Sequence, residues 1–253
     1  MGKKFPPPNP LHFLPARPRG ATHLIMLNTP IQKQEKVYYT KTYAALTPSS
    51  GYRQLDWQSL KGNRKFIHEI KKVATKLRAK KILDLGCGNG RLAVPLAKSG
   101  FDVYGIDFAS SAIQRANHLA KKSGTSQNTH FSVGNALSLP YPENFFDLIF
   151  DYGCLHHISE KYWQLYLKNV SRVLKRDGYL LLYTHDINSL FYKKYTPRIG
   201  QQEFVVENVL THFFDKADFP KIFQKNFLII SAKLAKHPAT SNKRMWTVLL
   251  KRK

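Results

Sequence analysis

The chain has 253 residues, of which 43% are hydrophobic and 13% aromatic; this is enough for one α/β domain with a sizeable core and excludes a collagen-like or wholly disordered chain. Its 40 Lys and Arg against 16 Asp and Glu leave a formal net charge of +24. Such a charge indicates solubility and attraction to anionic partners, and it says nothing about the fold. Two cysteines exclude a disulfide scaffold, and no apolar run is long enough to span a membrane, so we expect a cytoplasmic protein.

Residues 1–37 are rich in proline and basic residues, and the first acidic residue is Glu35. Because proline fixes φ and removes a backbone donor, we expect a flexible, polyproline-like tail. An organelle-targeting segment is the alternative, although the serine-rich amphipathic helix typical of one is missing. Residues 38–253 are predicted to form a single domain.

Helical and strand patterns alternate from residue 61 onward. Apolar residues at spacings of three and four predict helices, and short apolar runs predict strands. The expected helices cover residues 61–77, 91–98, 110–122 and 159–175, and the expected strands cover 81–85, 102–107, 129–133, 147–151 and 179–183. Gly178 is expected to cap the last helix in a left-handed conformation.

This alternation favours a doubly wound α/β fold, with a mostly parallel sheet and helices on both faces. Residues 227–231 and 246–250 depart from the pattern, because two β-rich runs follow one another without a helix between them. We expect them to form an antiparallel pair that closes a seven-stranded sheet.

A glycine-rich turn, Gly-Cys-Gly-Asn-Gly at residues 86–90, follows the first strand, at the edge where parallel sheets bind ligands. Glycine allows a tight turn and lets backbone N–H groups approach a ligand. Asp107 ends the second strand, where a carboxylate can accept hydrogen bonds from both hydroxyls of a ribose. The two features together predict a nucleoside site. A turn without a ligand, and a helix-capping role for Asp107, are the plainer alternatives.

Several segments resemble the class I S-adenosylmethionine-dependent methyltransferases. The similarity is close over about residues 80–183, in the runs 82–90, 105–107, 134–136, 139–141, 146–149, 151–157 and 174–178. The Leu-His-His ending at 155–157 and the Trp-containing final strand are most similar to the small-molecule branches, including thiopurine and tellurite-resistance-type enzymes. The resemblance implies a Rossmann-like fold, S-adenosylmethionine as cofactor, S-adenosylhomocysteine as product, and in-line methyl transfer to a small molecule.

The resemblance also assigns cofactor contacts to residues at the ends of strands. They are Asp84, Gly86, Cys87, Gly88, Asn89 and Gly90 for the methionine part, Asp107 for the ribose, Phe108, Asn135 and Ala136 for the adenine, and Asp151 and Tyr152 for the methionine amino group. The family usually has Asp at position 135. Asn135 still offers an acceptor oxygen without charge, so we expect binding to be retained but weaker. Core packing is the alternative role for Phe108.

His156 and His157 follow the fourth strand at the same edge. A sulfonium methyl is already electrophilic, so the protein mainly has to hold the acceptor in line and exclude water. A hydroxyl or protonated amine acceptor also needs a base, and we therefore assign both histidines as candidate catalytic residues. Packing, or capping of the helix near Ser159, is the alternative.

Neither cysteine is expected to carry chemistry. Cys154 follows Gly153 rather than the proline that precedes a cytosine-5 methyltransferase nucleophile, so we expect a small buried thiol. No metal site is predicted, because no Cys-x-x-Cys spacing supports a set made from Cys87, Cys154, His156 and His157.

Two aromatic groups are candidate lids over the acceptor, with packing under the sheet edge as the alternative for the first. They are Tyr38, Tyr39, Tyr43 and Trp57 before the first helix, and Leu190, Phe191, Tyr192 and Tyr195 after the fifth strand.

The basic residues concentrate at 61–81 and after Pro220, and they suit either a solvated surface or nucleic-acid binding. Strand four ends in Asp-Tyr-Gly-Cys and not in the Pro-Pro-Tyr of enzymes that methylate base amines. A small-molecule acceptor is therefore favoured. RNA or another nucleic acid is the alternative acceptor, and a protein or a lipid is a further one. A cofactor-binding regulatory module is a separate, non-enzymatic hypothesis.

Overall fold

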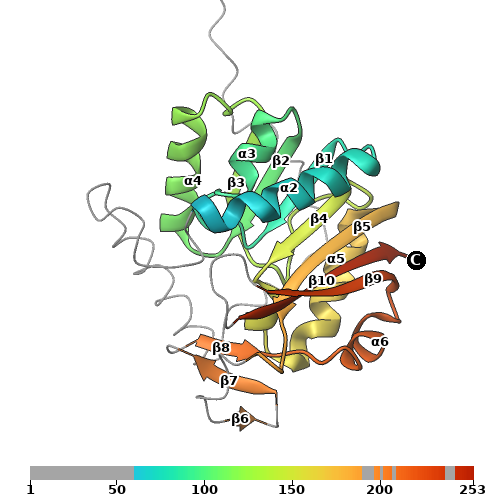
Figure 1. Cartoon of the computed structure of the whole chain (residues 1–253). Helices are drawn as coiled ribbons and strands as arrows, with labels where there is room; N and C mark the ends of the chain where they lie inside the picture. Colours follow the sequence, from blue (N-terminus) through green and yellow to red (C-terminus); the bar gives the residue numbers. More distant parts are fainter. Residues whose placement is uncertain (1–59, 190–196, 200–201, 207–208, 237–242) are drawn as a thin grey trace, which may run out of the picture.

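The computed structural model describes residues 60–189, 197–199, 202–206, 209–236 and 243–253 (Figure 1). The predicted flexible tail and both aromatic lid groups lie outside these residues. The division of the chain at residue 38 therefore stays a prediction.

A seven-stranded sheet runs through the centre in the order β3-β2-β1-β4-β5-β10-β9. Its parallel strands are β1 (Lys81–Leu85), β2 (Asp102–Asp107), β3 (Thr129–Val133), β4 (Phe146–Tyr152) and β5 (Leu174–His185). β10 (Arg244–Arg252) is antiparallel to β5, and β9 (Phe227–Lys236) is antiparallel to β10. The predicted doubly wound sheet with an antiparallel C-terminal pair is confirmed.

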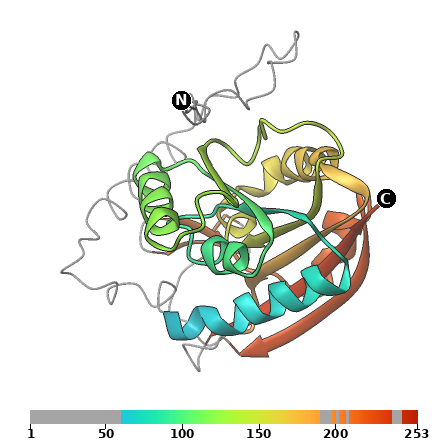
Figure 2. The same ribbon diagram turned by 90° about the horizontal axis from the view of Figure 1, so that it is seen from above.

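Helices cover both faces of this sheet (Figure 1, Figure 2). α2 (Leu60–Lys76) and α3 (Ala93–Lys98) bury apolar side chains such as Phe66, Ile70 and Leu96 against one face, and α4 (Ser110–Lys122) packs beside α3. α5 (Trp163–Val173) and α6 (Asp218–Phe223) bury Tyr166 and Phe223 against the other face. The sheet is therefore covered on both sides, as the parallel arrangement requires.

The end of α5 differs from the prediction. The 3₁₀ helix η4 (Glu160–Tyr162) precedes α5, and β5 begins directly after it at Leu174. Gly178 lies inside β5 without a positive φ, so the predicted left-handed cap is wrong. Phe146 pairs with Leu174 and Leu148 with Tyr179, so residues 175–178 bulge from the ladder. Pairing with β4 outweighs the local capping signal.

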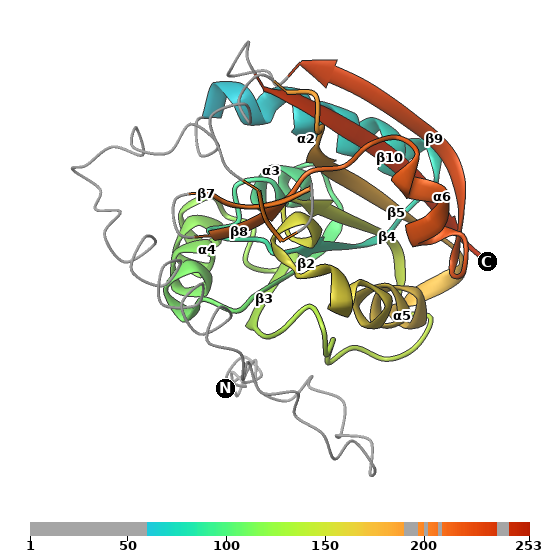
Figure 3. The ribbon, with the colours of Figure 1, turned by 90° about the horizontal axis from the view of Figure 1, so that it is seen from below.

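Some elements escaped the sequence patterns. The small sheet β6-β7-β8 (Pro197–Ile199, Glu203–Val206 and Val209–His212) and the helix α6 were not predicted. Residues 134–145, all of which the structure describes, connect β3 to β4 without a helix, so the alternation of strand and helix is interrupted once. β8 packs against the 3₁₀ helix η3 (Leu155–His157) that follows β4 (Figure 3). The small sheet thus adjoins the predicted acceptor side.

None of the helices in the described part of the chain combines the length and apolar character needed to cross a membrane.

Candidate cofactor and acceptor site

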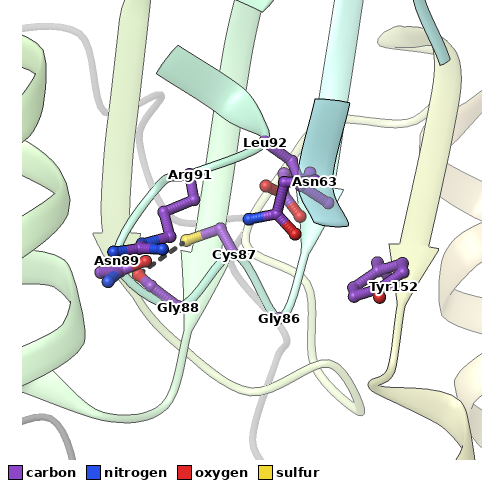
Figure 4. A pocket seen from close by; sticks show the side chains of 9 residues that line it. Asn63, Gly86, Cys87, Gly88, Asn89, Arg91, Leu92 and Tyr152 are labelled. Atoms are coloured by element: carbon purple, nitrogen blue, oxygen red, sulfur yellow. Dashed lines mark hydrogen bonds between the residues drawn. The ribbon is translucent and has the colours of Figure 1, made fainter. Parts of the chain in front are cut away.

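The strand order reverses at β1, which pairs with β2 on one side and with β4 on the other. The loops leaving β1 and β4 diverge there and leave room for a ligand at the carboxyl edge. A pocket lies at this point, lined by Asn63, Asp84, Gly86, Cys87, Gly88, Asn89, Arg91, Leu92 and Tyr152 (Figure 4). Asn89 and Arg91 lie on one side of it and Tyr152 on the other, with Asn63 between them. Six of the predicted cofactor residues are thus among its nine lining residues.

The turn at residues 86–90 depends on glycine for both its shape and its close packing. Gly86 has a φ of 76°, and a Cβ there would lie 3.0 Å from the Cβ of Cys154. Gly90 has a φ of 77°, and a Cβ there would lie 3.0 Å from the Phe131 ring. Larger residues would strain the backbone and press on neighbouring elements, so the turn keeps its shape only with glycine at these positions.

Asp107 joins the glycine turn to the start of α4. Its Oδ2 accepts a hydrogen bond from the Gly88 N–H at 2.9 Å, and its Oδ1 accepts one from the Ala109 N–H at 2.9 Å. The contact at the start of α4 is the capping alternative, and it coexists with ligand binding because each carboxylate oxygen keeps a second lone pair. Burial raises the pKa of Asp107 to about 6, although hydrogen bonds from the backbone N–H groups of Ala109, Gly88 and Phe108 act against the rise.

Three buried carboxyl groups, Asp84, Asp107 and Asp151, gather at this edge of a chain whose net charge is +24. Burial, followed by the charges of Asp107 and Asp151, raises the pKa of Asp84 well above its usual value. Ionised Asp107 and Asp151 therefore disfavour the ionisation of Asp84. A cationic ligand group at this edge would relieve that repulsion.

The carboxylate of Asp151 holds the turn after β4. Oδ1 accepts a hydrogen bond from the Cys154 N–H at 2.7 Å, and Oδ2 accepts from the Leu155 N–H at 2.9 Å and the Tyr166 hydroxyl at 2.6 Å. The residue is fully buried, and burial raises its pKa to about 6. The side chain predicted beside the methionine amino group is thus engaged in fixing the segment that leads to the histidines.

The residues predicted at the adenine end follow β2 and β3 and are half-buried: Phe108, Asn135 and Ala136. Asn135 Oδ1 accepts a hydrogen bond from the Leu137 N–H at 2.9 Å. The oxygen assigned to the adenine amino group therefore already has one backbone donor, and only its second lone pair remains for a ligand.

A family model described as a methyltransferase domain matches residues 76–227. The chain belongs to this methyltransferase family. Human EEF1A lysine methyltransferase 2 is 39% identical over 109 residues, which are 40% of this chain and 45% of that protein. The 27-O-demethylrifamycin SV methyltransferase of Amycolatopsis mediterranei is 34% identical over 103 residues, 40% of this chain and 37% of that protein.

Among solved structures, a SAM-dependent methyltransferase of Methanosarcina mazei is 26% identical, with a TM-score of 0.62. The alignment covers 68% of this chain and 92% of that one. The chain spans less than half the length of the curated relatives that it matches.

The two histidines of this methyltransferase domain have different surroundings. His156 is 3% exposed, and its ring centroid lies 4.3 Å from that of His157 and 4.4 Å from that of His185. Burial, followed by the neighbouring histidines, lowers its pKa well below the usual value. This environment corresponds to the packing alternative.

His157 is only partly buried and is oriented by β8. Its Nδ1 lies 2.8 Å from the Leu210 carbonyl oxygen, which can only accept a hydrogen bond. Nδ1 therefore carries the proton, and Nε2 holds the lone pair of the neutral ring. Burial lowers the pKa of His157 to about 4, so the ring is neutral near pH 7. Of the pair, His157 is the one whose ring is oriented by a backbone contact, and its assignment as a base stays a prediction.

Three lining residues of the pocket were missed by the sequence analysis: Asn63, Arg91 and Leu92. Asn63 is 3% exposed and lies on the same stripe of α2 as Phe66 and Ile70. A polar residue on an otherwise apolar stripe is a signal that could have identified it. Arg91 directly follows the glycine turn and offers the pocket a guanidinium group. Leu210, whose carbonyl oxygen orients His157, was also missed, and nothing in the sequence pattern around it marks this role.

Both cysteines are free thiols. Cys87 is buried and lines the pocket, whereas Cys154 is only partly buried, so the expectation of a buried thiol at that position is wrong. The position of Cys154 follows from the β4 turn, which sets its Cβ directly over Gly86.

Proposed function

We propose that this chain is an S-adenosylmethionine-dependent methyltransferase that transfers a methyl group to a small-molecule acceptor by in-line displacement. The observation that carries the proposal is the hydrogen bond between the Gly88 N–H and Asp107, which ties the glycine turn to a carboxylate at the point where the strand order reverses. Membership of the methyltransferase family supports the same conclusion.

The residues of the pocket fit such a cofactor. Gly86 and Gly88 line the pocket without side chains, which favours room for an amino-acid tail, and Asp84 and Tyr152 line the same pocket. Arg91 and Asn63 offer donors for the carboxylate of that tail, while Asp107 offers acceptors for the ribose. Phe108, Asn135 and Ala136 remain assigned to the adenine. When bound, S-adenosylmethionine supplies an electrophilic sulfonium methyl group.

The protein itself has to position the acceptor, exclude water and, for a hydroxyl or amine, accept a proton. His157 supports the last task, because the Leu210 carbonyl directs its lone pair to Nε2. The 3₁₀ helix η3 after β4 packs against β8, and an additional element at this edge favours a small molecule over a polymer. The Amycolatopsis relative is named for a small molecule and the human relative for a protein lysine, so the acceptor has to be measured.

Binding is tested first, by calorimetry of the full chain with S-adenosylhomocysteine and with S-adenosylmethionine. We expect saturable heat with each, and no heat with either compound would overturn the proposed function.

Turnover is tested next, as production of S-adenosylhomocysteine with three separated cell fractions: small metabolites, proteins and RNA. We expect turnover to rise with the metabolite fraction and to resist RNase. Turnover that rises only with the protein fraction, or that RNase abolishes, would contradict the small-molecule acceptor and leave the methyltransferase assignment in place.

A further inference from the structure

A second group of polar side chains lies outside the cofactor pocket, on three different elements. Glu160 belongs to η4, Glu203 begins β7, and His212 ends β8. Each offers one ligand atom, and these atoms all lie within 4.8 Å of one another. We propose that Glu160, Glu203 and His212 bind a divalent transition-metal ion, with Zn²⁺ as the best-suited metal.

His212 is the observation that points to a ligand. The residue is 2% exposed, and its buried Nδ1 has no hydrogen-bond partner among the described residues. Nδ1 lies 3.7 Å from Oε1 of Glu203, which is too long for a hydrogen bond. A buried nitrogen left in this state is costly, and a metal ion on the Glu203 side would satisfy it.

The ring of His212 is held in its orientation by aromatic neighbours. Its centroid lies 4.4 Å from that of Trp163, at an interplanar angle of 78°, and 4.7 Å from that of Phe214. Glu203 is fixed as well, because it pairs with His212 in the β7–β8 ladder and its Oε1 accepts a hydrogen bond from the Glu160 N–H at 3.2 Å. Two of the three ligands are therefore preorganised.

The donor set selects the metal. One imidazole nitrogen and two carboxylate oxygens are ligands that Zn²⁺ accepts, whereas Ca²⁺ takes six to eight oxygens. Tetrahedral Zn²⁺ with bonds of about 2.0–2.1 Å places its ligand atoms roughly 3.4 Å apart. The Glu203–His212 distance of 3.7 Å is already close to this value. Glu160 is exposed and can move inward, and water would complete the shell.

The site would connect the small sheet to the segment that carries the histidines. Glu160 lies three residues after His157, and His212 lies two residues after Leu210, whose carbonyl orients His157. A metal ion would therefore hold β8 against η3 and η4. None of its ligands lines the cofactor pocket, so binding of the metal does not depend on the proposed function.

The experiment is a calorimetric titration of the chelator-treated full chain with Zn²⁺, without cofactor or acceptor, together with elemental analysis after gel filtration. We expect one Zn²⁺ per chain and a higher melting temperature when the metal is added, since a ligand that binds the folded state stabilises it. No retained zinc and no stabilisation would overturn the proposal.

Three variants locate the metal. Glu160→Gln alters an exposed side chain and should leave the fold intact on circular dichroism; His212→Gln removes the nitrogen ligand. We expect each to weaken Zn²⁺ binding at least about 10-fold and to reduce the thermal stabilisation. His130→Gln, an exposed histidine that pairs with Asp102 on the main sheet, is the matched control and should bind as the wild type does. Unchanged binding in Glu160→Gln, or equal losses in the control, would place the zinc elsewhere and refute the site.

Discussion

At the scale of single residues, the proposed cofactor binding should depend most directly on the ionisation of Asp107. Asp107 is 8% exposed, and its carboxylate already accepts hydrogen bonds from the Gly88 and Ala109 N–H groups, so its pKa of about 6 is set by burial against hydrogen bonding. Above that pH it is a charged acceptor. Because the pKa of the folded state exceeds the unfolded value of 3.8, ionisation of Asp107 opposes folding; this cost is complete above about pH 6 and is lost as the pH falls from about 6 to 3.8.

Affinity for S-adenosylhomocysteine should therefore fall as the pH drops through about 6, because a protonated Asp107 loses an acceptor for the ribose. Asp107→Asn should bind about 10- to 100-fold more weakly at neutral pH and lose most of this pH dependence, as expected for a hydrogen bond to a charged group. Calorimetry from about pH 5 to 8 checks this, with Asp102→Asn at the other end of β2 as control. A variant that keeps the wild-type pH profile would show that another group titrates.

His157 and His156 should differ in their effects. We expect His157→Ala to lower turnover with the small-molecule fraction by about 10²- to 10⁴-fold, the usual contribution of a general base, and to leave affinity for S-adenosylhomocysteine within a few-fold of the wild type. His156→Ala should act mainly on the free energy of unfolding, because His156 is packed between other rings. Kinetics, calorimetry and urea unfolding of both variants provide the comparison. Equal losses of cofactor binding and turnover in His157→Ala would argue against a base.

At the scale of elements, the segment after β4 is held by a contact between a strand end and a helix. Tyr166 of α5 donates a hydrogen bond to the buried carboxylate of Asp151 at 2.6 Å, and two backbone N–H groups of the turn donate to the same carboxylate. The register of β5 also positions the end of β4. Residues 175–178 bulge from the ladder, and Tyr179 then pairs with Leu148. α5, β4 and β5 therefore determine together where the histidines lie.

Removal of the Tyr166 hydroxyl should test this contact. Tyr166→Phe leaves a buried carboxylate with one donor fewer, so we expect the free energy of unfolding to fall by about 1.5–3 kcal/mol. Tyr162→Phe, on the half-buried turn before α5, is the matched control and should change stability by less than about 0.5 kcal/mol. Urea unfolding followed by circular dichroism measures both. Equal changes in the two variants would mean that the hydroxyl of Tyr166 contributes little.

At the scale of the whole molecule, a large positive charge coexists with an apolar sheet edge. β9 forms one edge of the central sheet and exposes Leu228, Ile229, Ile230 and Leu234. An exposed apolar edge strand is a template for pairing with another chain. The net charge of +24 opposes such pairing by repulsion between molecules, so we expect any pairing through this edge to depend on ionic strength.

Raising the salt concentration from about 0.1 M to about 1 M shortens the Debye length from roughly 10 Å to 3 Å, and we expect light scattering to show self-association as repulsion is screened. Ile230→Lys should suppress it. Val133→Lys adds the same charge on the opposite edge strand, β3, at a residue that is 53% exposed against 51% for Ile230. Equal suppression by both variants would show that net charge, and not the β9 edge, controls association.

The sequence alone predicted the strands of the central sheet and placed the glycine turn and Asp107 at its carboxyl edge. The glycine turn and Asp107 lie within one strand–helix–strand unit, and the parallel pairing of β1 with β2 sets Leu85 opposite Ile106 and so brings the two features together. Local patterns are sufficient for this arrangement, because hydrophobic periodicity and glycine spacing report directly on neighbouring elements.

Only the tertiary structure decided the orientation of His157 and the grouping of the proposed metal ligands. Leu210 orients His157 across 53 residues, and the proposed metal ligands come from η4, β7 and β8. These contacts form only when the chain after β5 folds back over η3, and no spacing in the sequence records that return. Gly178 makes the same point within a single element. Its neighbours favour a helix cap, but Leu174 and Tyr179 on either side of it pair with β4, and Gly178 lies in the bulge between them.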